Sequence, residues 1–337
     1  MAAPFTGHRL VDRNPHVSAE ALLRSLVPPP LFESVTFDSY VPDPAEPTQA
    51  AAVAALRAFA ARPARSSSNQ QWWRRGRARP ESRAGVYLDG GFGVGKTHLL
   101  AALWHECEGA RLFATFVELS YLVGALGFAD AIARLKSYHL VCIDEFELDD
   151  PGDTVLMSTL LQALADDGVR LAATSNTLPD RLGEDRFAAA DFLREIHGLA
   201  AHFDVIRVDG PDYRHRVMSY ATVPTSEADI ELVVSSASSP AVDEFGELLA
   251  HLANVHPSQY GALVANLDLV AWLNVRVIED QAAALRLVVL VDRLYDRGVT
   301  VMGTGVPLGD IFSEEMLRGG YRKKYFRALS RLLAMAP

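Results

Sequence analysis

The feature that most constrains this chain is a glycine-rich motif that ends in Lys96 and Thr97. Residues 90–97 read GGFGVGKT, which matches the phosphate-loop pattern G-x-x-x-x-G-K-T. The apolar run at 85–88 predicts a buried strand before the motif, and residues 97–104 predict a helix after it. At a strand-to-helix turn, backbone N–H groups can point at phosphate oxygens, and glycines let the backbone approach them closely. The sequence therefore predicts a nucleotide-binding site.

The motif also indicates how its residues would divide the work of binding ATP. Lys96 would place a positive charge beside the β- and γ-phosphates, and the Thr97 hydroxyl would be a ligand of Mg²⁺. The other positions would cradle the phosphates, mainly through their backbone groups. The candidate residues for binding ATP are Gly90, Gly91, Phe92, Gly93, Val94, Gly95, Lys96, Thr97 and His98.

Two acids follow a second apolar run. Residues 140–143 predict a buried strand that ends in Asp144 and Glu145. In a parallel sheet, the carboxyl end of this strand would lie beside the phosphate loop. We expect Asp144 to hold Mg²⁺ through its water shell, and Glu145 to orient and polarise the water that attacks the γ-phosphate. The spacing of about 50 residues supports this interpretation, because it leaves room for a helix, a strand and a second helix.

A third predicted strand, at 169–173, is followed by small polar residues and Asn176. An amide at this position can hydrogen-bond both the attacking water and the γ-phosphate, so Asn176 is a candidate sensor of the bound nucleotide. Asparagine also occurs simply as a turn residue at the end of a strand. The phosphate loop and the paired acids that precede it favour the sensing role.

Charge and composition narrow the class of protein. With 32 lysines and arginines against 42 aspartates and glutamates, the net charge is −10, so no global basic field attracts nucleic acid. Cys107 and Cys142 are expected on a helix and a buried strand, which argues against a disulfide framework and indicates a reducing, cytoplasmic environment. The most apolar stretch, at 285–292, is interrupted by charge, so we expect no integral membrane segment.

The chain begins with a proline-rich stretch that predicts an extended arm. Within it, Phe37 and Tyr40 either pack on the core or close over a nucleotide base. Two serine-rich and threonine-rich stretches separate the C-terminal part from the motifs. The predicted domains are the arm at 1–45, an ATPase core at 46–217 with a basic loop at 64–83, and a C-terminal extension at 218–337 that ends in a basic helix.

The C-terminal stretch carries a weak internal echo of the core. A helix at 282–298 and a strand at 299–302 resemble the helix at 155–168 and the strand at 169–173, with a Gly-Val turn in each pair. We therefore expect an α/β extension rather than a purely helical lid. The predicted fold is α/β, a P-loop NTPase core with a parallel sheet flanked by helices, plus this extension.

Further segments resemble the cell division protein ZapE family of AAA+ ATPases and its mitochondrial relatives. The resemblance extends from about residue 30 to residue 335. The segments that carry it beyond the phosphate loop are CIDEFELDD at 142–150, ATSN at 173–176, DYR at 212–214, LVDRLYD at 290–296 and FRALSRL at 326–332. The resemblance implies a Mg²⁺-dependent ATPase that assembles as a ring and moves a protein client, in bacteria the tubulin-like division protein.

The resemblance also implies arginines that reach the γ-phosphate, and here the sequence departs from the family pattern. The arginine that usually precedes a Phe-Leu-Pro-Phe-like segment has no clean counterpart, so Arg186 and Arg194 are both candidates for a finger that acts on a neighbouring subunit, with Arg186 preferred. In the terminal helix, Lys324, Arg327 and Arg331 share one face, which is typical of a solvated surface. The resemblance makes Arg331 a candidate nucleotide sensor.

Two other classes of protein remain open. The basic loop places Trp72 and Trp73 beside several arginines, which suits stacking on single-stranded nucleic acid and equally suits a surface loop. The phosphate-loop segment is also similar to that of helicase loaders of the DnaC or DnaA type, which act on DNA or on a helicase. The third class is a scaffold that binds ATP and hydrolyses it slowly.

Overall fold

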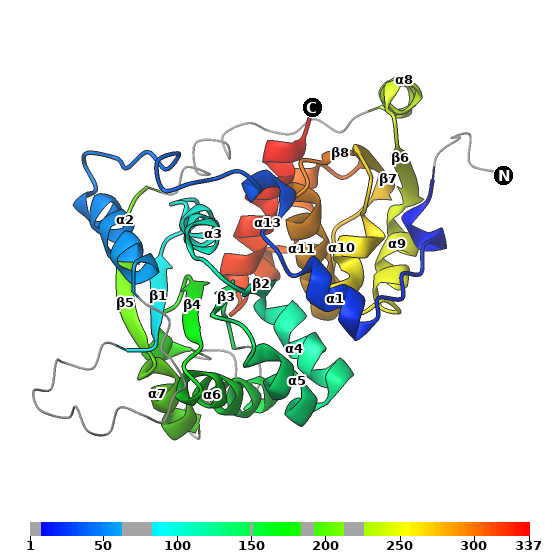
Figure 1. Ribbon diagram of the computed structural model, residues 1–337. Helices are drawn as coiled ribbons and strands as arrows, with labels where there is room; N and C mark the ends of the chain where they lie inside the picture. The colour runs from blue at the N-terminus through cyan, green and yellow to red at the C-terminus, as the bar shows by residue number, and fades with distance from the viewer. Residues whose placement is uncertain (1–7, 63–82, 149–150, 183–191, 212–225) are drawn as a thin grey trace, which may run out of the picture. The chain divides into compact units, whose positions relative to one another are not determined.

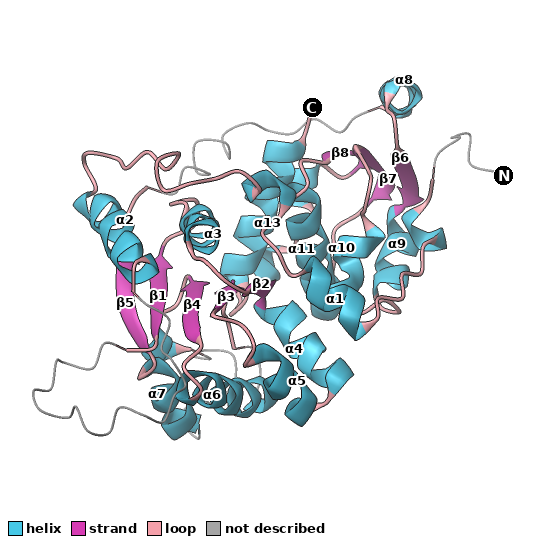
Figure 2. Ribbon diagram, in the orientation of Figure 1, coloured by secondary structure: helices cyan, strands magenta, loops and turns pink. Residues whose placement is uncertain are grey.

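The computed structural model describes residues 8–62, 83–148, 151–182, 192–211 and 226–337 (Figure 1). They belong to two compact units, which we describe separately. The first, called here the P-loop unit, comprises Ala19–Pro28 and Phe32–Asp212. The second, called the C-terminal unit, comprises Met1–Ser18, Pro29–Leu31 and Tyr213–Pro337. Both units contain strands and helices (Figure 2).

The sheet of the P-loop unit is parallel. Its strands are β1 (Gly85–Gly90), β2 (Arg111–Thr115), β3 (Leu140–Asp144), β4 (Arg170–Ser175) and β5 (Phe203–Val208). Their spatial order is β2-β3-β4-β1-β5. The inner strands β1, β3 and β4 are buried along their whole length, which explains their continuous apolar runs. Because the sheet is parallel, the carboxyl ends of β3 and β4 lie at the same edge of the sheet as the end of β1, where the phosphate-loop motif begins.

Helices cover both faces of this sheet. They are α1 (Ala19–Ser25), α2 (Pro47–Ala60), α3 (Lys96–Glu106), α4 (Phe116–Leu126), α5 (Phe128–Leu135), α6 (Pro151–Asp166), α7 (Leu193–Ala200) and the 3₁₀ helix η4 (Pro179–Arg181). α3 packs across β1 to β4 and α2 packs on α3 and β5, so both lie on one face. α4 packs on β2 and β3, and α6 packs on β4, on the other face, as right-handed crossovers require. The predicted P-loop core is therefore confirmed.

The N-terminal stretch is not the purely extended arm that its prolines predicted. α1 forms within residues 16–27, which contain no proline and are long enough for two helical turns. Leu22 and Leu26 are buried, and the carbonyl oxygen of Leu26 accepts a hydrogen bond from the backbone N–H of Phe113 in β2. This segment thus covers an outer edge of the P-loop sheet.

The C-terminal unit contains a second parallel sheet. Its strands, in spatial order, are β6 (Pro240–Glu244), β7 (Leu269–Val275) and β8 (Thr300–Gly305). The helices are α8 (Glu227–Ser236), α9 (Phe245–Leu252), α10 (Tyr260–Leu263), α11 (Gln281–Tyr295), α12 (Glu314–Arg318) and α13 (Arg322–Met335), with 3₁₀ helices η1 (Leu10–Asp12), η2 (Pro30–Phe32), η7 (Pro257–Gln259) and η8 (Leu308–Asp310). This architecture confirms the predicted α/β extension.

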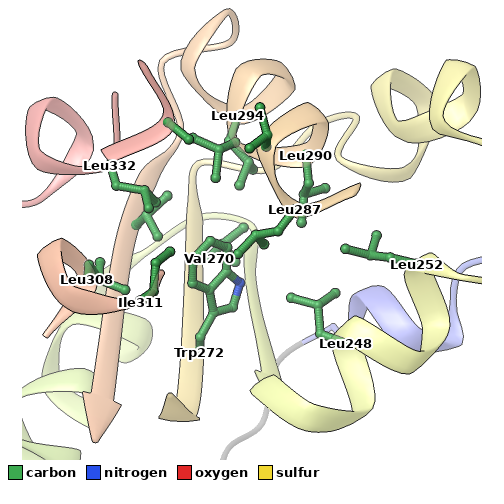
Figure 3. Packing of buried hydrophobic residues seen from close by; sticks show 14 of the residues in the cluster. Leu248, Leu252, Val270, Trp272, Leu287, Leu290, Leu294, Leu308, Ile311 and Leu332 are labelled. Atoms are coloured by element: carbon green, nitrogen blue, oxygen red, sulfur yellow. The ribbon is translucent and has the colours of Figure 1, made fainter. Parts of the chain in front are cut away.

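Alternate residues of β7 serve two cores. Leu269, Ala271 and Leu273 pack in a small cluster with residues of α8. Val270 and Trp272 face the opposite way, into the main core of the unit (Figure 3). That core is built from α9, α11 and α13, and its members include Leu248, Leu252, Leu287, Leu290, Leu294, Leu308, Ile311 and Leu332. Helices therefore cover both faces of the C-terminal sheet as well.

The C-terminal sheet repeats three of the five strands of the P-loop sheet at a nearly constant distance along the sequence. β6 and β7 pair in the same register as β2 and β3, with residue numbers that are 129 higher in both strands. β7 and β8 likewise pair as β3 and β4 do, with numbers 129 higher in β7 and 130 higher in β8. The paired residues are Arg111↔Leu140 and Leu140↔Arg170 in the P-loop sheet, and Pro240↔Leu269 and Leu269↔Thr300 in the C-terminal sheet. The three strands thus have the same neighbours and the same alignment in both units.

The turn that precedes the last strand of each repeat is also the same. Gly168 and Gly298 adopt φ values of 89° and 64° at the ends of α6 and α11, a conformation that glycine allows at low cost. In each case the N–H of the following valine bonds back to a leucine carbonyl oxygen in the last turn of the helix, at 3.0 and 3.1 Å. The internal echo predicted from the sequence is confirmed and extends over three strands.

Two further sequence expectations concern membranes and cysteines. In the parts of the chain that the structure describes, no single helix is long and apolar enough to cross a membrane; only the bent pair α4 and α5, at an angle of 118°, meets that criterion jointly. Cys107 and Cys142 are both buried and free. Burial raises the pKa of the Cys142 thiol well above its ordinary value, so this thiol stays protonated and unreactive.

Candidate functional site

The phosphate-loop motif forms the turn between β1 and α3. Gly93 and Gly95 adopt φ values of 77° and 87°, which are unfavourable for residues with a side chain. A Cβ atom at Gly90 would lie 2.1 Å from the backbone oxygen of Val208 in β5, so this position has no room for a side chain. Conformation and space thus both require glycine in this turn.

Lys96 is the first residue of α3, and its ammonium group lies inside the turn. It donates to the backbone oxygens of Gly90 and Gly91, at 2.9 and 2.6 Å, and to Oδ1 of Asn176, at 2.7 Å. Asn176 directly follows β4, which neighbours β1 in the sheet. The structure therefore brings together the candidate phosphate ligand and the candidate sensor, which are 80 residues apart in the sequence.

The candidate metal ligands lie side by side. The Thr97 hydroxyl is 3.1 and 3.3 Å from the two carboxylate oxygens of Asp144, which is buried at the end of β3. Both groups offer the oxygen atoms that Mg²⁺ prefers, and Mg²⁺ commonly takes only one or two protein ligands besides water and phosphate. No group of three or more His, Cys, Asp or Glu side chains within the described ranges could hold a metal ion. The pair fits Mg²⁺ bound together with a nucleotide.

Thr174, which the sequence reasoning did not single out, contacts both acids at the end of β3. Its hydroxyl donates to the carboxylate of Asp144 and accepts a hydrogen bond from the backbone N–H of Glu145, with an N···O distance of 3.0 Å. Glu145 has a φ of 55°, in the left-handed region that is unusual for glutamate. The sequence feature that could have pointed to Thr174 is the ATSN segment, in which it stands two residues before Asn176.

A second feature that the sequence left open is the position of Tyr40. Its hydroxyl donates to the backbone oxygen of Val94 at 2.8 Å, and its ring makes an edge contact with that of His98, with 5.6 Å between centroids. Nε2 of His98 lies 3.0 Å from the Ser39 hydroxyl and 3.2 Å from the backbone oxygen of Thr36. The segment that contains Tyr40 therefore lies against the phosphate loop and the first turn of α3, instead of packing only in the core.

The structure describes one of the two candidates for the arginine finger. Arg186 falls outside the described residues, as do residues 64–82 of the basic loop and the segment at 212–214. Arg194 is exposed and bonds to its neighbour Glu195, at 2.8 Å. The role of Arg186 or Arg194 as a finger therefore stays a prediction.

Arg331 belongs to a buried ion cluster of the C-terminal unit. It pairs with Asp292, which also accepts a hydrogen bond from Arg327 at 2.7 Å. Burial alone would raise the pKa of the Asp292 carboxyl, but the charges of Arg327 and Arg331 outweigh it and hold this pKa below its ordinary value. The expectation of a solvated face is wrong for Arg327, because α13 packs on α11 and turns this side chain into the unit.

Comparisons with known proteins place the chain in a family. It is 29% identical over 309 residues to the cell division protein ZapE of Escherichia coli K12, which covers 78% of this chain and 81% of that protein. It is 26% identical over 185 residues to lactation elevated protein 1 homolog B of Danio rerio, covering 47% and 37%.

Among solved structures, domain III of the replication initiation protein DnaA from Thermotoga maritima superimposes with a TM-score of 0.42 at 18% identity, covering 61% of this chain and 82% of that one. The DnaC helicase loader superimposes with a TM-score of 0.37 at 15% identity, covering 52% and 98%. The model of the AFG1-like ATPase family matches residues 16–234 and 233–337, which is most of the sequence. The chain therefore belongs to the AFG1-like ATPase family, the family of ZapE.

Proposed function

We propose that this protein hydrolyses ATP to ADP and phosphate in a Mg²⁺-dependent reaction. The observation that carries the proposal is the meeting of four side chains from three elements at one edge of the P-loop sheet. Lys96 and Thr97 begin α3, Asp144 ends β3 and Asn176 follows β4. A positive charge, two oxygen ligands for the metal and an amide are the groups that phosphoryl transfer needs around the γ-phosphate.

The contacts suggest how these groups would act when ATP binds. The phosphates would replace backbone oxygens as partners of the Lys96 ammonium, and Asn176 would then contact the γ-phosphate or the attacking water. Thr97 and Asp144 would hold Mg²⁺, which neutralises developing charge on the phosphates. Glu145 follows Asp144 at the strand end and would orient and polarise the water.

The family relation supports a protein client as the target of this activity. ZapE, to which the chain is similar over most of its length, is a cell division protein. We propose a role in cell division for this protein too, with the tubulin-like division protein as the first client to test, in the cytoplasm. A ring of subunits would let Arg186, or else Arg194, reach the γ-phosphate of the neighbouring subunit. Residues 46–217 would form the ATPase core and 218–337 the extension.

A nucleic-acid target is the second candidate, and one observation favours it. Trp72 and Trp73 stand among arginines in the basic loop, a combination that binds single strands through charge and stacking. The net charge of −10 opposes binding of a polyanion elsewhere on the chain. A scaffold that hydrolyses ATP slowly differs from both by its turnover alone.

Steady-state ATP turnover separates these functions. It would be measured for the protein alone, with single-stranded DNA, and with purified division proteins including the tubulin-like one. Stimulation by a division protein supports the proposed function, whereas stimulation by DNA alone assigns the chain to the helicase-loader class. Tight ATP binding with slow turnover under all three conditions assigns it to the scaffold class.

A further inference from the structure

We infer that Thr174 is a positioning residue of the ATPase site, which holds the carboxylate of Asp144 and the backbone of Glu145 in the arrangement that hydrolysis requires. The inference rests on the proposed ATPase function. Thr174 lies in β4 and is only 2% exposed, so its hydroxyl finds its partners within the protein. A hydroxyl has one proton to donate, and here that proton goes to Asp144.

The contact fixes the Asp144 carboxylate from one side. Thr97 contacts the same carboxylate from α3, so Asp144 lies between the hydroxyls of Thr97 and Thr174. A carboxylate held by two donors from different elements has little rotational freedom. Its oxygens are therefore in place before the metal and the nucleotide arrive, and less ordering remains to be done during the reaction.

The same side chain fixes the start of the segment that carries Glu145. The hydroxyl of Thr174 accepts the N–H of Glu145, and the backbone oxygen of Thr174 accepts the N–H of Phe146 at 2.7 Å. These two bonds hold Glu145 in the left-handed conformation, which is unfavourable without them. Because the backbone conformation sets the direction in which a side chain leaves the chain, Thr174 also sets the direction of the Glu145 carboxylate.

The C-terminal unit contains an equivalent pair of residues, but no acidic residue stands at the position that corresponds to Asp144. Asn274 has a φ of 54°, and its N–H donates to the hydroxyl of Thr304 in β8 at 2.9 Å. Thr304 is related to Thr174 by the shift of 130 residues that relates β8 to β4, but Leu273 stands at the position of Asp144. Accepting a backbone N–H at a strand end is therefore a structural role common to Thr174 and Thr304, whereas Thr174 also donates to the carboxylate that we propose holds the metal.

This repeat supplies a matched control for the experiment. Thr174→Val and Thr304→Val each remove one buried hydroxyl that accepts one N–H from a left-handed residue. Thr174→Ser retains the hydroxyl and tests whether the oxygen matters. For each full-length variant we would measure melting temperature, affinity for a fluorescent ATP analogue, kcat, KM and the Mg²⁺ concentration that gives half-maximal turnover.

We expect Thr174→Val to lower kcat by about 10- to 100-fold, the scale of a misplaced reacting group, with analogue affinity within about threefold of wild type. Its Mg²⁺ requirement should rise. Thr304→Val should keep kcat and the Mg²⁺ requirement within about twofold despite a similar loss of melting temperature, and Thr174→Ser should keep most of the activity. Equal kcat and Mg²⁺ requirement in the two valine variants would overturn the inference. If Thr174→Val does not fold, a folded Thr174→Ser with kcat lowered by more than about tenfold overturns it as well.

The proposed function can fail separately. A wild type that binds the analogue but does not hydrolyse ATP contradicts the ATPase proposal. In that case the Mg²⁺ dependence of analogue binding decides the inference: a higher Mg²⁺ requirement in Thr174→Val than in Thr304→Val supports positioning of Asp144, and equal requirements contradict it.

Discussion

Replacing Gly95 by alanine should weaken ATP binding through two separable effects. The first is conformational, because Gly95 has a φ of 87° and an alanine in the left-handed region costs about 1–2 kcal/mol. The second is steric. The new Cβ atom would lie 2.6 Å from Cε2 of Tyr40, far inside van der Waals contact. The ring would have to move, and its hydrogen bond to Val94 would be lost, at a further cost of about 1 kcal/mol.

Together these effects amount to about 2–3 kcal/mol, which corresponds to an affinity loss of roughly 30- to 150-fold. The cost appears as lost affinity because a loop that relaxes away from this conformation must regain it when the phosphates bind. In a Tyr40→Ala background the steric part is absent. Gly95→Ala should then cost only about 1–2 kcal/mol, or roughly 5- to 30-fold.

The assay is titration of a fluorescent ATP analogue into wild type, both single variants and the double variant at fixed Mg²⁺. Melting temperatures of the four proteins show whether each is folded. The double-mutant cycle isolates the contact between Tyr40 and Gly95. An unchanged affinity in Gly95→Ala would refute the reasoning about the loop, and identical losses in both backgrounds would refute the role of Tyr40.

Four other predictions address the ion cluster, the assembly and the target. Asp292→Asn should destabilise the protein by about 3–5 kcal/mol in urea unfolding, because it leaves buried arginines beside a neutral amide. Since the folded pKa of Asp292 is depressed, its contribution to stability should be present above the ordinary carboxyl pKa and disappear as pH falls through the folded value, so wild type and variant should converge in acid. Mixing inactive Glu145→Gln chains with Arg186→Ala chains should restore turnover if the finger acts between subunits; strictly additive activities would argue against a ring. Single-stranded DNA should bind weakly and hardly quench tryptophan fluorescence, whereas tight, salt-sensitive binding that Trp72→Ala/Trp73→Ala abolishes would favour the helicase-loader class.

The sequence predicted those parts of the fold that depend on local pattern. The glycine motif identified the turn between β1 and α3, and the apolar runs identified β3 and β4, because buried parallel strands read as continuous hydrophobic stretches. The internal echo was visible only in its last helix and strand. The first two strands of the repeat, β6 and β7, pair in the same register as β2 and β3, but their sequences show no evident similarity to those strands. The full repeat is therefore seen from the strand pairing.

Contacts between distant segments could not be predicted in the same way. The left-handed conformation of Glu145 depends on Thr174, which lies 29 residues further along and in another strand. The helical spacing of Lys324, Arg327 and Arg331 indicated a shared face but not what covers it. The structure places Asp292 against two of these residues, since α13 packs along α11. Side-chain partners across elements follow from the packing of helices and strands, which residue spacing alone does not define.

The central claim, that this site binds and hydrolyses ATP, is tested most directly by phosphate release measured beside nucleotide binding in wild type, Lys96→Ala and Glu145→Gln. The account predicts that Lys96→Ala loses ATP affinity, because the ammonium group no longer faces the phosphates. It predicts that Glu145→Gln retains ATP while turnover falls by about a hundredfold or more, the scale expected when a positioned base is lost. Wild-type rates of phosphate release in Glu145→Gln, or wild-type ATP affinity in Lys96→Ala, would contradict it.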